Sequence, residues 1–141
     1  MKKSVLFICV DQWRWDCFSF MKHKNALTPN IDNLVKESTA FTYHFAGIVP
    51  CGPARTTMLT GLYPFIHRSV TNGAPLDKRF TNIAKEARKI GYDPKLYGYT
   101  DTSWDPRYLE PSDEKNFTYE SPMEGFDPVC HLPQGNPVTW A

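Results

Sequence analysis

Residues 49–64 read Val-Pro-Cys-Gly-Pro-Ala-Arg-Thr-Thr-Met-Leu-Thr-Gly-Leu-Tyr-Pro, a proline-containing loop that leads into a helix-forming run. The first backbone N–H groups of a helix lack intrahelical partners, and with the helix dipole they favour negative charge. Cys51 lies at this loop-to-helix junction, and one turn later Arg55 can bind an oxyanion there through two hydrogen bonds. The stretch therefore predicts an anion pocket around a reactive sulfur, and a helix over residues 56–62.

The segments before this stretch show both strand and helix patterns. Residues 5–10 are a continuous apolar run with β-branched members, which is typical of a strand buried in a parallel sheet. Residues 40–45 favour a second strand. Thr28-Pro29, followed by apolar residues at helical spacing, predicts a helix that runs through Glu37. Such alternation predicts an α/β fold with a mostly parallel sheet flanked by helices.

The alternation continues downstream and then stops. Residues 83–90 have helical spacing, Gly91 fits the left-handed position that ends a helix, and residues 95–99 favour a strand. Residues 106–141 are interrupted by prolines throughout, so we expect a loop-rich tail there. The predicted organisation is an N-terminal part of an α/β domain in residues 1–105, extended irregularly by the rest of the same domain.

The composition is that of an ordinary globular protein. Sixteen Lys and Arg against fifteen Asp and Glu give a net charge of +1, which excludes a broad field for nucleic acid or a membrane surface. The apolar run at residues 5–10 is far shorter than the roughly 18 residues that span a bilayer. Asp11 follows it with no cleavage pattern, so we expect a strand rather than a signal peptide, and a cytoplasmic protein. Cys9 is expected in the core.

Two other interpretations of Cys51 are open at this point. A cysteine in a proline-containing turn is commonly a small buried residue with no chemistry. A cysteine-dependent phosphatase would also place Cys and Arg in one loop, but with a longer spacing than the three residues found here. The spacing argues against the phosphatase.

The pattern Cys-x-Pro-x-Arg in residues 51–55, with Thr-Gly-x-Tyr-Pro in residues 60–64, resembles the sulfatase signature of the alkaline phosphatase superfamily. Asp11-Gln12 after the first predicted strand and the helix that starts at Thr28-Pro29 extend the resemblance. The segments most similar to the phosphonate monoester hydrolase and related arylsulfatase branch are residues 72–77, 98–100 and 105–107.

This resemblance implies a hydrolase of small-molecule sulfate esters, with phosphonate monoesters and phosphodiesters as the alternative substrates. It also implies that a formylglycine-generating enzyme oxidises Cys51 to formylglycine. In such enzymes one hydroxyl of the hydrated aldehyde attacks sulfur or phosphorus, and the other then expels the anion and restores the aldehyde. Oligomers are compatible with this interpretation.

The resemblance further implies a divalent metal, Ca²⁺, Mn²⁺ or Mg²⁺, which are cations that prefer oxygen ligands. The implied ligands are Asp11, Gln12 and the modified Cys51. Many sulfatases have a second aspartate where this chain has Gln12, so the site would carry less negative charge. Hard cations generally take about six oxygen ligands. We therefore expect little turnover from these 141 residues alone, and a noncatalytic fragment is the alternative.

The other implied site residues surround the transferred group. Arg55 would hold the diol and neutralise charge, while Asn72 and Tyr99 would donate hydrogen bonds to that group. Asn72-Gly73 also suits a turn, so a structural role for Asn72 is open. Asp101 would repel a substrate anion unless it is protonated, paired or turned away. For His67 a structural role is favoured over acid–base work.

Overall fold

The computed structural model describes residues 3–117 and 122–130, and the chain divides into two compact units, residues 1–44 and 45–141. In the first unit a 3-10 helix, η1 (Ser19–Met21), contacts helix α1 (Pro29–Lys36). The side chain of Asp32 joins them, because it accepts hydrogen bonds from Ser19 Oγ at 2.7 Å and from the Phe20 N–H at 3.2 Å. The predicted helix start at Pro29 is confirmed.

Residues 5–10 differ from the prediction. They form no strand, and their apolar side chains are exposed, up to 84% for Leu6. Cys9 is exposed as well, so its predicted place in the core is wrong. A strand needs the backbone edge of another strand as its partner. Within the described part of this unit the regular elements are η1 and α1, and neither offers such an edge.

The predicted strand at residues 40–45 is also absent, because a turn at residues 42–43 interrupts it. An apolar, aromatic run favours burial, but a strand forms only where the backbone finds a partner strand.

Of the helices found in the described residues, none is long and apolar enough to cross a bilayer.

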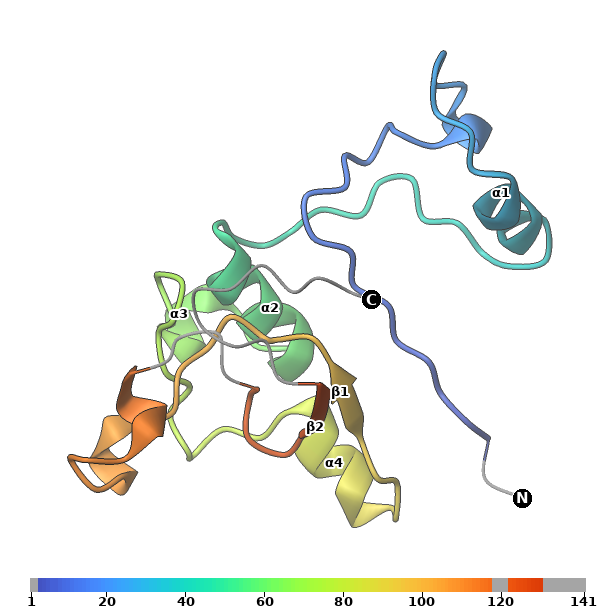
Figure 1. Ribbon diagram of the computed structural model, residues 1–141. Helices are drawn as coiled ribbons and strands as arrows, with labels where there is room; N and C mark the ends of the chain where they lie inside the picture. Colours follow the sequence, from blue (N-terminus) through green and yellow to red (C-terminus); the bar gives the residue numbers. More distant parts are fainter. Residues whose placement is uncertain (1–2, 118–121, 131–141) are drawn as a thin grey trace. The chain divides into compact units, whose positions relative to one another are not determined.

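The second unit contains three helices, two strands and two 3-10 turns in its described part: α2 (Cys51–Thr60), α3 (Pro64–His67), α4 (Ile83–Lys89), β1 (Lys95–Tyr97), η2 (Pro106–Tyr108), η3 (Glu114–Phe117) and β2 (Asp127–Cys130). The strands β1 and β2 pair in parallel, with Lys95 opposite Asp127 (Figure 1). Helix α2 contacts α3 and α4. The parallel arrangement predicted for the sheet is confirmed in this pair, although the partner of β1 lies in the segment predicted to be irregular. The predicted helix that ends at Gly91, whose φ is 80°, is also confirmed.

Helix α2 begins at Cys51, earlier than the predicted start at residue 56. Pro53 fits this first turn because its missing N–H would have no intrahelical partner there. Three threonine hydroxyls donate to carbonyls one turn back, and Thr56 Oγ to the Gly52 carbonyl at 2.9 Å is one of them. Gly61, with a φ of 69°, ends the helix. Cys51 thus lies on the helix itself.

The tail is not irregular throughout, because β2 forms inside it and includes Pro128. The Asp127 N–H donates to the Pro94 carbonyl at 2.9 Å, on the side of β1. Neighbouring residues of a strand direct their backbone groups to opposite sides, so the nitrogen of Pro128 faces away from this ladder. The predicted boundary at residue 105 stays a prediction.

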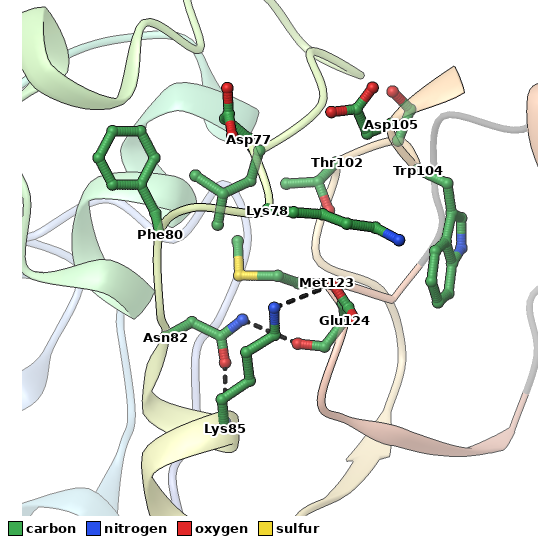
Figure 2. A pocket seen from close by; sticks show the side chains of 12 residues that line it. Asp77, Lys78, Phe80, Asn82, Lys85, Thr102, Trp104, Asp105, Met123 and Glu124 are labelled. Carbon is green, nitrogen blue, oxygen red and sulfur yellow. Dashed lines mark hydrogen bonds and ion pairs between the residues drawn. The ribbon is translucent and has the colours of Figure 1, made fainter. Parts of the chain in front are cut away.

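Asn82, which caps α4, and Lys85 within α4 attach the tail to the rest of the unit. Asn82 is only 2% exposed: its Oδ1 accepts the Lys85 N–H at 3.0 Å, and its Nδ2 donates to the Glu124 carbonyl at 2.8 Å. Lys85 Nζ lies 2.9 Å from Glu124 Oε2, and Figure 2 shows the three side chains together. Among the described residues the buried apolar side chains include Pro53, Leu59, Ala84 and Met123.

Replacing Asn82 by alanine should lower the free energy of unfolding by about 1–3 kcal/mol, because α4 loses its cap and the Glu124 carbonyl loses its donor. Urea titration followed by circular dichroism measures this change. The control is Asn25→Ala at an exposed position, where a change below about 0.5 kcal/mol is expected. Equal losses in the two variants would contradict the role given to Asn82.

Candidate active site

The predicted nucleophile is the first residue of α2 and is half-buried. Cys51 and Arg55 lie one turn apart, which places their side chains on the same face of the helix. Pro53 has no N–H, and the Gly52 N–H is bonded to Asn72 Oδ1 at 2.9 Å. The backbone therefore offers fewer donors than the sequence suggests, and side chains must supply most contacts to an anion.

Arg55 is buried, with 9% of its surface exposed, and Tyr99 holds its guanidinium. Arg55 Nη1 donates to the Tyr99 carbonyl at 3.1 Å, and Cζ lies 4.3 Å from the centre of the Tyr99 ring. A guanidinium stacked on an aromatic face has little rotational freedom left. The charge is thus fixed on the helix face that also carries Cys51.

Asn72 reaches the start of the same helix from the loop after α3. Because the Gly52 N–H donates to it, the oxygen of the amide must face the helix, and its two N–H donors face away. Asn72 is exposed, so these donors can reach a bound group. Cys51, Arg55, Asn72 and Tyr99 are therefore brought together around the start of α2, and their chemical roles stay predictions.

Asp101 has a backbone role that its sequence position does not reveal. Its φ is 58°, a left-handed conformation that Asp tolerates better than β-branched residues do. Its carbonyl accepts the Gly73 N–H at 3.2 Å. Asp101 is only 4% exposed. The residue joins the loop after β1 to the loop that carries Asn72.

His67 is buried, and both of its ring nitrogens are engaged inside the unit. Nδ1 accepts the Ser69 N–H at 3.0 Å, so the ring proton belongs on Nε2, which lies 2.9 Å from Thr57 Oγ. Burial lowers the pKa of His67 below its ordinary value. These contacts favour the structural role that the sequence suggested.

The stability of the protein should fall as the pH is lowered from about 7.5 to 5.5, because the unfolded chain binds a proton at His67 near pH 6.5 while the folded chain resists it. The His67→Gln variant should show a smaller fall. Asp105, whose pKa is lowered by hydrogen bonding to Arg107, loses its contribution only below about pH 4, outside this window. Urea midpoints at the two pH values test this. Identical pH dependence in both proteins would contradict it.

Asp11 and Gln12, the predicted metal ligands, occupy a turn of the first unit, where Gln12 has a φ of 56°. Hard cations prefer oxygen ligands such as carboxylates and amide carbonyls, so the side-chain types of Asp11 and Gln12 suit the implied metal. Residues 3–117 and 122–130 contain no group of three or more His, Cys, Asp or Glu side chains able to hold a metal. The metal role of Asp11, Gln12 and residue 51 stays a prediction.

The second unit also contains cavities that are lined by residues other than Cys51, Arg55, Asn72 and Tyr99. The one drawn in Figure 2, between α4 and the loops around Trp104 and Met123, has a volume of about 20 Å³, room for roughly one water molecule. A wider groove of about 370 Å³ lies beside Arg68, Arg79 and Arg107. Arg107 is already bonded there to Asp77 at 3.1 Å and to Asp105 at 2.5 Å. Neither cavity contains a predicted site residue.

The chain is similar to known proteins in both sequence and structure. The family described as Sulfatase matches residues 3–137. The multifunctional alkaline phosphatase superfamily protein PehA of Trinickia caryophylli is 44% identical over 133 residues, which are 91% of this chain and 26% of PehA. The phosphonate monoester hydrolase of Agrobacterium radiobacter has a TM-score of 0.83 and 51% identity over 88% of this chain and 25% of its own. SpPMH, a phosphonate monoester hydrolase from Silicibacter pomeroyi, has a TM-score of 0.85 and 45% identity over 91% and 25%.

This chain spans about a quarter of the length of each of these relatives. The structural matches confirm the predicted α/β class and the likeness to the alkaline phosphatase superfamily. The resemblance first drawn from residues 51–64 is confirmed over nearly the whole chain. The chain belongs to the sulfatase family.

Proposed function

We propose that these residues form part of the active site of a formylglycine-dependent hydrolase of singly charged esters, phosphonate monoesters and sulfate esters. The observation that carries this proposal is the gathering of Arg55, Asn72 and Tyr99 around Cys51 at the start of α2. The similarity to two phosphonate monoester hydrolases supports the first substrate, and membership of the sulfatase family supports the second. Both esters carry similar charge at the transferred group, so one pocket can accept both.

Each residue has a defined task in this proposal. Cys51, once converted to formylglycine, supplies the attacking hydroxyl, and Arg55 neutralises negative charge beside it. Asn72 donates an N–H to the transferred group, and Tyr99 holds the guanidinium and presents its hydroxyl. Asp11, Gln12 and one oxygen of the modified residue 51 would hold the metal, which when bound lowers the pKa of a coordinated hydroxyl.

The test uses the full-length gene product, expressed with a formylglycine-generating enzyme and assayed with Mn²⁺ and with Ca²⁺. Release of nitrophenol from nitrophenyl phenylphosphonate and from nitrophenyl sulfate gives the two values of kcat/KM. Turnover of both esters is expected, with the ratio ranking the substrates, and a chelator should abolish both rates. Turnover of neither ester by protein whose intact mass shows formylglycine would contradict the proposal.

A further inference from the structure

Gly52, between the nucleophile and Pro53, is packed closely against two other segments. A Cβ atom built on Gly52 would lie 2.6 Å from the Asp101 carbonyl oxygen and 3.0 Å from Asn72 Cα. Real side chains essentially never make a Cβ contact below 3.0 Å, and both of these neighbours are backbone atoms that cannot rotate aside. The lack of a side chain at residue 52 is thus what lets the helix start approach these loops.

This close approach has a chemical consequence at Asn72. With the backbones this near, the Gly52 N–H reaches Asn72 Oδ1 at 2.9 Å. The Gly73 N–H donates to the same Asp101 carbonyl that a Cβ would meet, so one carbonyl ties the two loops together at this point. The hydrogen bond determines which end of the Asn72 amide faces the helix and therefore where its N–H donors lie.

We propose that Gly52 is a positioning residue that acts through Asn72: its missing side chain and its N–H orient the Asn72 amide toward the group attacked by residue 51. This proposal rests on the proposed function for its catalytic consequence. Any larger residue at position 52 must push the Asn72 and Asp101 backbones away or displace the start of α2. Either shift breaks or lengthens the bond to Asn72 Oδ1 and turns the amide.

The chain provides a matched control for this substitution. A Cβ on Gly47, in the loop before α2, would lie 3.7 Å from Thr57 Cγ2, an ordinary van der Waals contact. Gly47→Ala and Gly52→Ala therefore add the same methyl group. The structure has space for this methyl group at residue 47 and none at residue 52. Gly52→Ala also leaves the Cys-x-Pro-x-Arg pattern intact, and rates are expressed per mole of formylglycine found by intact mass.

The kinetic experiment compares Gly52→Ala, Asn72→Ala and the double variant in the full-length gene product. We expect Gly52→Ala to lower kcat/KM by about 10²-fold, as for loss of one preorganised donor, and Gly47→Ala to stay within about twofold. The double variant should be about as slow as Asn72→Ala, because Gly52 acts through Asn72. A wild-type rate for Gly52→Ala, or losses that multiply in the double variant, would overturn the proposal.

A structural experiment decides the same point without turnover. The crystal structure of the Gly52→Ala protein should show Asn72 Oδ1 beyond hydrogen-bond distance of the residue-52 nitrogen, while Gly47→Ala keeps this bond. Retention of the bond in Gly52→Ala refutes the positioning role. A wild-type protein that hydrolyses neither ester refutes the proposed function alone, because the crystal structures still decide the role of Gly52.

Discussion

Replacing Cys51 by alanine should abolish ester hydrolysis, with a fall in kcat of about 10⁶, the size seen when an enzyme loses its covalent nucleophile. Alanine has no sulfur to oxidise, so no formylglycine and no attacking hydroxyl can form. Arg55 and Asn72 remain in place and can still bind the anion. KM should therefore change much less than kcat. Initial rates on nitrophenyl phenylphosphonate, with intact mass on the same samples, measure both effects.

The control for this experiment is Cys9→Ala, the same change at an exposed thiol. Its rate should match that of the wild-type protein. The peptide that contains residue 51 should show loss of a thiol and gain of an aldehyde in the wild type and in Cys9→Ala, and neither change in Cys51→Ala. Appreciable turnover by Cys51→Ala would contradict the proposal that the modified residue 51 is the nucleophile.

Replacing Arg55 by alanine should lower kcat/KM by about 10²–10³, since one fixed charge beside the reacting group is lost. Lysine should restore little of this rate. Its ammonium lacks the planar fork, and so it cannot both stack on the Tyr99 ring and donate to the Tyr99 carbonyl as Arg55 does. Steady-state kinetics of the alanine and lysine variants on both esters test the prediction.

Stability must be measured beside these rates because Arg55 is buried. Its loss leaves the Tyr99 carbonyl without this donor, so we expect a decrease of about 1–3 kcal/mol in the free energy of unfolding. Rates are compared at temperatures where each variant is fully folded. If Arg55→Lys restores full activity, charge alone suffices, and the hydrogen bond and ring contact of Arg55 with Tyr99 are not required.

The helices α1 and α4 and the signature were predictable because their signals are local, whereas the start of α2 was placed five residues too late. Pro29 has a φ that already suits a helix start, and Gly91 can adopt the positive φ that ends a helix, whatever surrounds them. The Cys-x-Pro-x-Arg pattern likewise places Cys51 and Arg55 on one helix face. The strand predicted at residues 5–10 was wrong for the opposite reason. An apolar run forms a strand only when the edge of another strand is present to pair with it.

The contacts of Gly52 and Asp101 could not be predicted. In the sequence, the glycine after Cys51 looks replaceable by any small residue. The space for a side chain there is closed by the Asp101 carbonyl, which belongs to a distant segment and would lie 2.6 Å from a Cβ on Gly52. The positive φ of Asp101 depends in the same way on the loop that its carbonyl joins. Such constraints come from the meeting of separate segments, and one sequence carries no local sign of them.

The parallel pair β1 and β2 also sets an order of events during synthesis. Lys95 and Asp127, which face each other in the ladder, are separated by 32 residues. The ribosome therefore releases β1 well before its partner, and at roughly 5–20 residues per second the first strand waits for seconds with an open edge. Until β2 emerges, that edge can pair with another nascent chain, so slow translation between the two strands should favour aggregation.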